Sequence, residues 1–373
     1  MIATQTLVIG ASLSGLAAAA CLKRQGIDFQ IIERAAQIAT PWRNHYDRLH
    51  LHTSKKYSHL PYKKFKSAIP RYPSRQQVID YLEEYRAAFD IHPLFNTQAL
   101  SVRKEGDRWT TTTNNGVFAS QFVIMATGAY GHPRPIQFSG LDTFPGKVLH
   151  SYDYHSGRDF RGQKVLVVGF GNSACEIAID LYEQGARPAL SVRSPVNVVP
   201  RDILGIPVLE LSIFLSRLSP RTADRISAPL VRALIGDLTR LGLKAMPYGP
   251  LEQISRDHKA PVLDIGAIRH IRQGHITLHN NIDHIEGNRV RFTDGKEDSF
   301  DALIAAIGYD RKDTGIVAVE PTRFADLQYP IAKQPYFGRD GLYFCGYWIS
   351  PTGQIREIAA DAQKIARHIA ARS

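Results

Sequence analysis

The segment from Phe144 to Ala174 reads FPGKVLHSYDYHSGRDFRGQKVLVVGFGNSA, and its second half contains the pattern that decides the fold. The apolar run Val165–Val168 is typical of a buried strand and meets the turn Gly169–Ala174, which has the pattern Gly-x-Gly-x-x-Ala. A helical pattern follows directly at Cys175–Asp180. Strand, glycine turn and helix in this order predict a dinucleotide-binding unit, because the turn brings a diphosphate close to the N–H groups of the helix N-terminus.

A second turn of this type opens the chain at Gly10, after an apolar strand that begins near Thr6. Glu33 lies 23 positions after Gly10, where an acidic side chain accepts a hydrogen bond from a ribose 2′-hydroxyl. Ser12 replaces the second glycine of the pattern, and its side chain is small and can still donate to a diphosphate. This turn therefore predicts a site for an unphosphorylated adenosine ribose. A phosphate-free strand–helix turn is the alternative.

Each turn is matched, later in the chain, by a hairpin pattern and an apolar strand that ends in Ala-x-Gly, at Phe122–Gly128 and at Ala302–Gly308. We therefore predict an α/β protein with two Rossmann-like dinucleotide-binding domains of three layers, each with a small antiparallel β element. The first of these domains is predicted over residues 1–153 and 310–373, and the second over 154–309. A helical insertion is expected at about 201–250, where it could be a lid, a dimer face or a membrane-surface patch.

The second copy differs from the first at the end of its second strand. Arg193 lies 24 positions after Gly169, close to where Glu33 stands in the first copy. An arginine cannot accept a bond from a 2′-hydroxyl, but it pairs well with a 2′-phosphate. The pair of sites thus predicts hydride transfer from NADPH to FAD, with a solvated surface arginine as the alternative interpretation of Arg193.

The three cysteines, Cys21, Cys175 and Cys345, are far apart in the sequence and form no Cys-x-x-Cys motif. A disulfide reductase of this architecture needs a cysteine pair, so the electrons are expected to pass to molecular oxygen, a quinone or another carrier. Widely spaced cysteines in apolar patterns also predict a reducing compartment.

The chain has 373 residues and a formal net charge of +11, which fits a basic surface or the attraction of anionic ligands. Its Lys and Arg residues are dispersed, which argues against nucleic acid as a partner. His45, His50, His52 and His59 lack the spacing of a metal site, so we expect no metal. The N-terminus leads straight into a strand and the most apolar middle segment, Ile203–Leu215, is too short to span a bilayer, so a cytoplasmic protein is expected.

The pattern Phe144-x-Gly146-x-x-x-His150-x-x-x-Tyr154 resembles the fingerprint of the class B flavin-dependent monooxygenases. Baeyer–Villiger members usually end this pattern in tryptophan, so Tyr154 argues against ester formation from ketones. Other stretches resemble the YUCCA-type branch of the family. They are Tyr46–His52, Tyr72–Arg75, Ile79–Glu83, Gly169–Ser173 and Pro261–Gly266.

The resemblance implies an enzyme that uses NADPH, FAD and O₂ and forms a C4a-(hydro)peroxyflavin, which oxygenates a small organic substrate at the domain junction. The substrate candidates are an aromatic 2-oxo acid, by oxidative decarboxylation, or a soft nitrogen or sulfur nucleophile. The rival functions are an NADPH oxidase or flavin reductase without oxygenation, and a non-enzymatic nucleotide-binding sensor. A homo-oligomer is possible.

The predicted site residues follow from these patterns and from the resemblance. Lys55 matches a lysine of the family and is a candidate to steer a carboxylate or peroxide, while Asn172 is a candidate contact for nicotinamide phosphates or the flavin edge. Ile307 stands where the family usually has threonine. The predicted FAD contacts are Gly10, Ser12, Leu13, Ser14, Glu33, Arg34, Trp42, Leu49, His52, Thr53, Val102, Ala126, Thr127, Gly128, Gly346 and Gln354. The predicted NADPH contacts are Gly169, Gly171, Asn172, Ser173, Arg193, Ser194, Ala306, Ile307, Gly308 and Tyr309.

Overall fold

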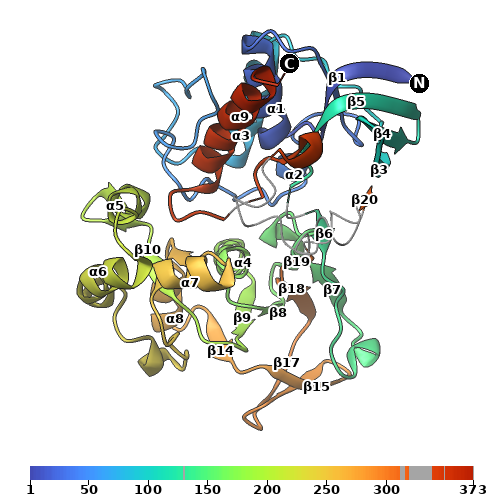
Figure 1. Ribbon diagram of the computed structural model, residues 1–373. Coiled ribbons are helices and arrows are strands. Elements are labelled where there is room, and N and C mark those ends of the chain that lie inside the picture. The colour runs from blue at the N-terminus through green and yellow to red at the C-terminus, as the bar shows by residue number, and fades with distance from the viewer. Residues whose placement is uncertain (129–130, 311–315, 319–337, 348, 373) are drawn as a thin grey trace. The chain divides into compact units, whose positions relative to one another are not determined.

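A computed structural model of the chain describes residues 1–128, 131–310, 316–318, 338–347 and 349–372. The chain forms two compact units (Figure 1). Unit 1 comprises residues 1–43, 53–132 and 309–373, and unit 2 comprises residues 44–52 and 133–308. The predicted boundary after residue 153 is displaced, because β7 (Lys147–His150) pairs with β18 (Ala302–Ala305) and so draws residues 133–153 into unit 2.

Unit 1 is built on a sheet with the strand order β2-β1-β5-β4-β3-β20, to which β21 is added beside β5. Strands β1 (Ile2–Ile9), β2 (Phe29–Ile32), β5 (Gly116–Met125) and β21 (Leu342–Phe344) are parallel neighbours. Strands β3 (Ala99–Glu105) and β4 (Arg108–Thr113) form an antiparallel meander with β5, and β20 (Val317–Ala318) pairs with β3. The sequence pattern favours separate strands at 117–119 and 122–128, whereas residues 116–125 form one strand that pairs with β4, β1 and β21.

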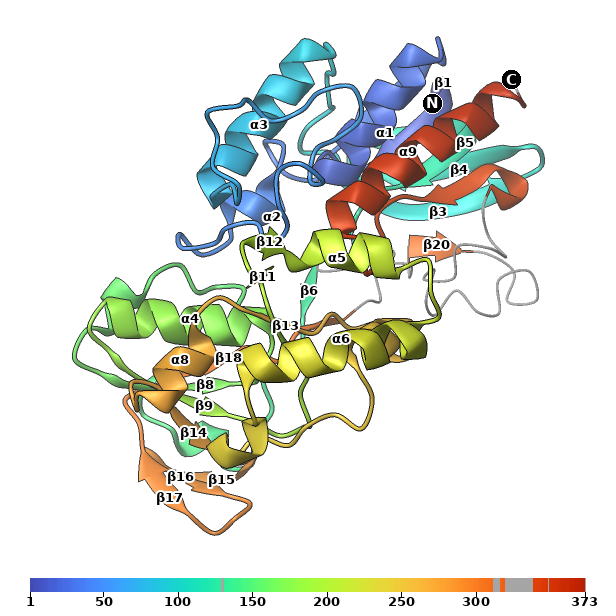
Figure 2. The ribbon, with the colours of Figure 1, turned by 90° about the vertical axis from the view of Figure 1, so that its left-hand side faces the viewer.

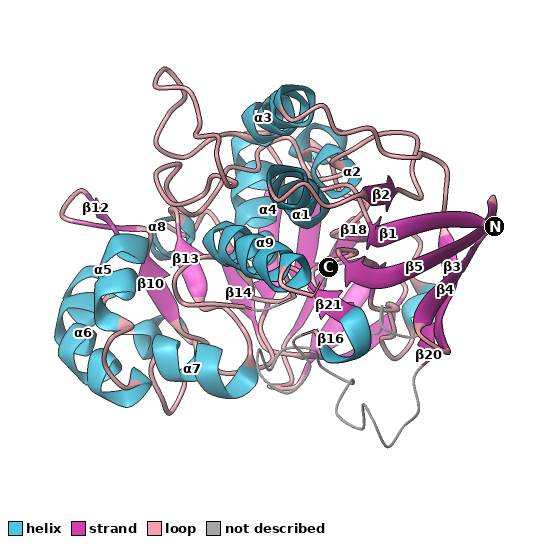
Figure 3. Cartoon of the chain, turned by 45° about the horizontal axis from the view of Figure 1, so that its top comes forward, coloured by secondary structure: helices cyan, strands magenta, loops and turns pink. Residues whose placement is uncertain are grey.

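Three helices pack together on the unit 1 sheet, as Figures 1 and 3 show. They are α1 (Leu13–Arg24), α3 (Arg75–Ala88) and α9 (Gln354–Ala370). The ends of α3 follow from its sequence, because Ser74 accepts from the backbone N–H of Gln77 and the Gln77 side chain accepts from the N–H of Ser74. The spacing of Val78, Tyr81, Leu82, Tyr85 and Phe89 predicts a stripe that faces inward, and the first four of these side chains are buried in α3. Short α2 (Thr40–Arg43) and the turn η5 (Arg339–Gly341) complete the unit.

Unit 2 contains a parallel sheet with the order β14-β9-β8-β18-β7 (Figure 2). Its other strands are β8 (Lys164–Val168), β9 (Arg187–Ser191) and β14 (Thr277–His279). Helices α4 (Asn172–Glu183) and α8 (Ala267–Arg272) pack beside the sheet, and an antiparallel element joins β15 (Ile282–Glu286), β16 (Arg289–Phe292) and β17 (Glu297–Ser299). Short turns η1 (Leu141–Thr143) and η2 (Gly157–Phe160) precede β7 and β8. Each unit thus has a parallel sheet, helices and an antiparallel element, which confirms the predicted fold class.

The predicted insertion of unit 2 folds as helices connected by short strands. It comprises β10 (Val198–Pro200), β11 (Asp202–Ile203), β12 (Ile206–Pro207), α5 (Val208–Leu215), α6 (Pro220–Ile235), η3 (Leu238–Leu241), α7 (Pro250–Asp257) and β13 (Val262–Asp264). The sequence pattern predicts one amphipathic helix at 222–241, but α6 ends at Ile235, because Gly236 has φ = +77° and terminates it. The chain passes between the units at β6 (His132–Pro133) and β19 (Tyr309–Asp310) as well as around 44–52.

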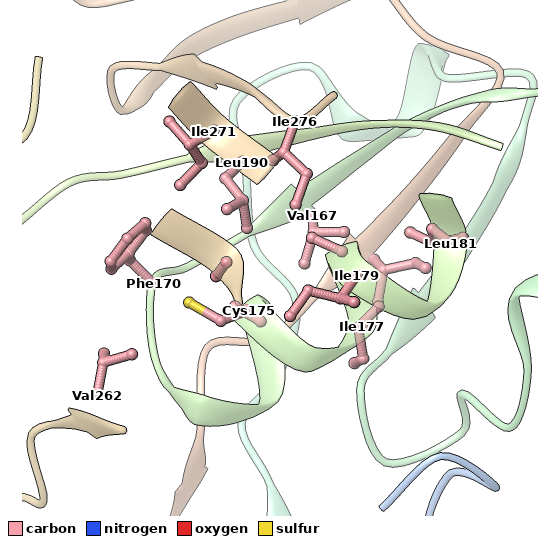
Figure 4. Close-up of a cluster of buried hydrophobic side chains, with 14 of the residues drawn as sticks. Val167, Phe170, Cys175, Ile177, Ile179, Leu181, Leu190, Val262, Ile271 and Ile276 are labelled. Atoms are coloured by element: carbon pink, nitrogen blue, oxygen red, sulfur yellow. The ribbon is translucent and has the colours of Figure 1, made fainter. Parts of the chain in front are cut away.

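The core of unit 2 forms where α4 meets β8, β9 and α8 (Figure 4). Val167, Ile177, Leu181 and Leu190 are completely buried, and Cys175 points into the same cluster. Burial raises the pKa of the Cys175 thiol well above its ordinary value. The thiol is therefore a packed apolar group and not a nucleophile. Among the described residues, no helix is both long and apolar enough to cross a bilayer.

Candidate functional site

The central residues of the predicted FAD site lie at one edge of the unit 1 sheet. Gly10 follows β1 and Glu33 follows β2, while Ala126 follows β5 and Gly346 comes shortly after β21. These strands are parallel neighbours, so their carboxyl ends share one edge. Doubly wound sheets bind nucleotides at this edge.

The Glu33 carboxylate is fixed in this turn by backbone donors. It accepts from the N–H of Ala11 at 2.8 Å and from the N–H of Ala35 at 3.0 Å. A carboxylate has about four acceptor positions, so two bonds leave capacity for the hydroxyl groups of a ribose. The geometry of Glu33 therefore fits its predicted role.

Ser14, Gly346 and Gln354 meet behind the turn. A Cβ on Gly346 would lie 2.1 Å from the Ser14 Oγ, so only glycine leaves room for that hydroxyl. The Gln354 side chain donates to the Gly346 carbonyl at 2.7 Å. Thr127 also contacts this segment, through a hydrogen bond with the hydroxyl of Tyr347. The structure thus brings these four predicted residues to the same region of unit 1.

Helices α1 and α4 begin at the two glycine turns without a capping side chain. Ser12 and Gly171 occupy the N-cap positions and make no side-chain cap bond, and neither helix has an acidic residue in its first turn. Helix α3 is fully capped by contrast. The first N–H groups of α1 and α4, with the positive end of each helix dipole, therefore fit a diphosphate.

The remaining predicted FAD residues lie on other parts of the fold. Val102 is completely buried within β3, Arg34 is exposed, and Trp42 is half-buried in α2. The Thr53 hydroxyl bonds to that of Ser58 at 2.6 Å. Gly128 comes shortly after the end of β5. Leu13 is the first residue of α1. Leu49 and His52 belong to unit 2, where Leu49 packs against the core around α4.

Most of the predicted NADPH residues lie at the corresponding edge of the unit 2 sheet, whereas Tyr309 lies in β19 and belongs to unit 1. Gly169 follows β8 and Ala306 follows β18, so the turn and its partner are adjacent. The space where a Cβ on Gly171 would lie is open, and packing against the described residues does not require glycine there. A diphosphate close to the backbone does require it. Ser173 lies in the first turn of α4, and Ile307 packs against an apolar cluster of unit 2.

A small basic pocket lies beyond the carboxyl ends of β9 and β14. Its volume is about 180 Å³, and its lining includes Arg193, Ser194, Lys244, Lys296 and one carboxylate, that of Asp294. Lys296 pairs with Asp294 at 3.6 Å, whereas the Arg193 side chain is exposed to solvent. Three cations around a cavity of this size can hold one phosphate group. Sequence reasoning identified Arg193 and Ser194 and missed the two lysines, which come from distant loops.

The two predicted catalytic side chains are both held by backbone groups. The Asn172 amide donates to the Pro261 carbonyl at 3.3 Å and accepts from the N–H of Leu263 at 2.8 Å. The Lys55 ammonium donates to the carbonyl oxygens of Lys66, Ser67 and Ile69. Each side chain therefore fixes a neighbouring loop, and Lys55 has no donor left for a substrate carboxylate.

The fingerprint residues form a scaffold within unit 2. Phe144 is buried in an apolar cluster, and a Cβ on Gly146 would lie 2.1 Å from the carbonyl oxygen of Asp301. His150 contacts the Gly308 carbonyl through Nε2 at 3.2 Å, and burial lowers its pKa. The Tyr154 hydroxyl donates to the buried Asp180 carboxylate at 2.6 Å. The fingerprint thus connects β7, the end of β18 and α4.

Helix α4 also carries a buried carboxylate that the sequence analysis missed. Glu176 is almost completely buried, bonds to His52 and lies 4.0 Å from the guanidinium of Arg48. Arg48 in turn pairs with Glu183 at 2.8 Å and holds the pKa of that carboxyl below its usual value. These bonds anchor residues 44–52 to α4. A sequence signal for this buried carboxylate exists, because Glu176 and Asp180 stand among apolar residues in the part of α4 that is buried.

Among the described residues, no group of three or more His, Cys, Asp or Glu side chains could hold a metal ion. A larger hollow of about 960 Å³ lies between α6, α7 and β10. None of the predicted site residues lines it.

We expect Tyr154→Phe to lower the free energy of unfolding by about 1–3 kcal/mol, because the buried Asp180 carboxylate would lose one of its two donors, the other being the N–H of Gly157. Thermal melting of the FAD-loaded protein measures the change. Tyr57→Phe is the control, since the Tyr57 hydroxyl makes no hydrogen bond to any described residue. Equal melting temperatures for Tyr154→Phe and the unmodified protein would contradict the structural role.

Comparisons with known proteins show the family of the chain. The family described as pyridine nucleotide-disulphide oxidoreductase matches residues 7–201. Indole-3-pyruvate monooxygenase YUCCA6 of Arabidopsis thaliana is 38% identical over 99% of this chain and 90% of its own length. Indole-3-pyruvate monooxygenase YUCCA1 of Oryza sativa subsp. japonica is 36% identical over 91% of this chain and 86% of its own length.

Solved structures share the fold. The flavin-containing monooxygenase of Stenotrophomonas maltophilia superimposes with a TM-score of 0.71 at 19% identity and covers 100% of this chain and 99% of its own. Cyclohexanone monooxygenase from Rhodococcus sp. Phi1, bound to NADP⁺, gives a TM-score of 0.75 at 16% identity over 99% and 84% of the two chains. The chain belongs to the broad pyridine nucleotide-disulphide oxidoreductase family and, within it, to the YUCCA-type flavin-dependent monooxygenases, which use FAD and NADPH.

Proposed function

We propose that this monooxygenase converts an aromatic 2-oxo acid to the carboxylic acid that is one carbon shorter. The observation that carries the proposal is the similarity, at 36–39% identity over most of the chain, to proteins named indole-3-pyruvate monooxygenases. Tyr154 at the end of the fingerprint is further support, because Baeyer–Villiger enzymes usually have tryptophan there.

The proposed reaction balances with the cofactors of the family. One 2-oxo acid, one O₂, one NADPH and one proton give the shortened acid, CO₂, water and NADP⁺. The bond between the two carbonyl carbons of the substrate breaks, one oxygen atom enters the product and the other leaves as water. When bound, NADPH supplies the hydride and FAD passes the electrons to oxygen.

The residues of the chain supply binding and orientation in this proposal. In unit 1, the N-terminus of α1 would hold the diphosphate of FAD and Glu33 would accept from its ribose. In unit 2, the N-terminus of α4 would hold the diphosphate of NADPH, and the pocket of Arg193, Lys244 and Lys296 would hold its 2′-phosphate. Asn172 and Lys55 act as positioning residues, since both are engaged by backbone groups.

Arg193→Ala is expected to raise the KM for NADPH roughly tenfold and to leave the KM for NADH nearly unchanged, because only NADPH carries the 2′-phosphate. Steady-state NAD(P)H oxidation at low ionic strength measures both constants. The matched control is Arg187→Ala at the opposite, amino-terminal end of the same strand β9. An equal change in both KM values would contradict the assignment of the pocket.

Substrate turnover distinguishes oxygenation from its rivals. With indole-3-pyruvate or phenylpyruvate, we expect NADPH consumption to accelerate and CO₂ and the shortened acid to appear in a one-to-one ratio with the O₂ consumed. Stoichiometric hydrogen peroxide with every 2-oxo acid, amine and sulfide would instead indicate an NADPH oxidase. Oxygenation confined to amines or sulfides would contradict the 2-oxo acid, and a preparation that does not retain FAD would contradict every flavin-dependent function.

A further inference from the structure

One titratable side chain of the basic pocket has no role in the proposed function. His279 is the last residue of β14 and lines the pocket together with Arg193, Lys244 and Lys296. Its backbone carbonyl accepts from the N–H of Val192 at 2.9 Å, so His279 lies beside the end of β9, just before Arg193. The imidazole therefore belongs to the same pocket as the cations proposed to hold the 2′-phosphate.

Aromatic packing fixes the orientation of the His279 ring. The ring stacks on that of Phe292, with centroids 4.3 Å apart and an angle of 14° between the planes. It also makes an edge contact with Phe300, at 5.8 Å and 88°. Both phenylalanines are almost completely buried. A side chain that is already held in this way loses little conformational entropy when it binds a ligand.

The two nitrogens of this ring have different surroundings. Nε2 is buried and lies 3.3 Å from a carboxylate oxygen of Asp298, which also pairs with Lys164. The side chain as a whole is 13% exposed, so its accessible part is not Nε2. A carboxylate beside Nε2 favours the tautomer with the proton on that nitrogen, which leaves Nδ1 to accept a second proton. The doubly protonated ring is a cation that can donate to a phosphate.

The surroundings of the ring favour its neutral form until an anion binds. The charged groups around it include the cations Lys164, Arg193, Lys244 and Lys296 and the carboxylates Asp294 and Asp298. Burial is the main reason why the pKa of His279 is lowered, and Lys164 and Lys296 act in the same direction, whereas the carboxylates oppose it. A phosphate in the pocket would add negative charge and pair with the cations, so it would raise the pKa of the ring.

We propose that His279 binds the 2′-phosphate of NADPH as an imidazolium, so that binding of NADPH takes up a proton and binding of NADH does not. The inference rests on the proposed assignment of the pocket to the 2′-phosphate. A group whose pKa rises on binding strengthens binding below the raised pKa and ceases to contribute above it. The preference for NADPH over NADH should therefore fall as the pH rises from 6.5 to 8.5.

Isothermal titration calorimetry of the FAD-loaded protein with NADP⁺ measures the proton uptake. Titrations at pH 7.0 in two buffers of different ionisation enthalpy, PIPES and imidazole, give the number of protons taken up per bound NADP⁺. We expect about half a proton for the unmodified protein. His279→Phe should take up almost none, because phenylalanine can keep the stack on Phe292 but does not titrate. The second pKa of a phosphate monoester is about 6, so the ligand itself contributes little at this pH.

Steady-state kinetics give a second measurement. The ratio of the KM for NADH to the KM for NADPH should fall roughly fivefold between pH 6.5 and pH 8.5 in the unmodified protein and stay nearly constant in His279→Phe. His155→Gln is the matched control, because His155 is an exposed histidine of unit 2 that does not line the pocket. The melting temperature and the KM for NADH of His279→Phe should match those of the unmodified protein, which separates loss of the charge from misfolding.

Two results would overturn the proposal. They are absence of proton uptake by the unmodified protein and equal uptake by His279→Phe. If either occurs while Arg193→Ala still abolishes the preference for NADPH, the role of His279 fails and the assignment of the pocket stands. If the unmodified protein prefers NADPH at no pH, the assignment of the pocket fails as well. Neither measurement depends on which substrate is oxygenated.

Discussion

The close approach of the first glycine of each turn to a neighbouring strand determines both nucleotide sites. A Cβ on Gly10 would lie 2.7 Å from the carbonyl oxygen of Ala126, and a Cβ on Gly169 would lie 2.5 Å from that of Ala306. Both glycines have positive φ, so any other residue would be strained as well as crowded. This contact explains why each glycine turn has an Ala-x-Gly partner later in the chain, and it points the N-termini of α1 and α4 along the sheet edges.

The two copies differ at the third position of the pattern. A Cβ on Gly15 would lie 1.8 Å from the Gly10 carbonyl oxygen, so the first copy needs glycine where helix and strand meet. The second copy has Ala174 there, completely buried, because its helix leaves room for a methyl group. Helix α4 then uses its buried face for two carboxylates. The Asp180 carboxylate accepts a hydrogen bond from the hydroxyl of Tyr154. The Glu176 carboxylate contacts His52, which lies in the loop 44–52. The contacts of the family fingerprint therefore stabilise unit 2.

The elements with a strong local signal were predictable from the sequence. The sequence from Ser74 to Phe89 predicts a helix, with Ser74 as its N-cap and apolar residues at helical spacing. Helix α3 forms at Arg75–Ala88, because both of these signals are local. The displaced boundary after residue 153 and the roles of Lys55 and Glu176 depend on contacts between segments far apart in sequence. Lys55 is engaged by carbonyl oxygens 11 to 14 residues away, and Glu176 meets His52 across 124 positions. The periodicity and spacing of residues in the sequence do not predict such contacts.

The cysteines help to decide which chemistry the shared architecture can support. Disulfide chemistry needs two thiols that are close together and ionisable. Here all three cysteines are free and buried, and burial raises the pKa of Cys21 to about 11. Burial also raises the pKa of the Cys345 thiol well above its ordinary value. A thiolate is thus disfavoured at every one of these positions. The chain keeps the two nucleotide turns of the broad family without its dithiol, so the electrons from NADPH must leave through a diffusible acceptor, as the monooxygenase branch requires.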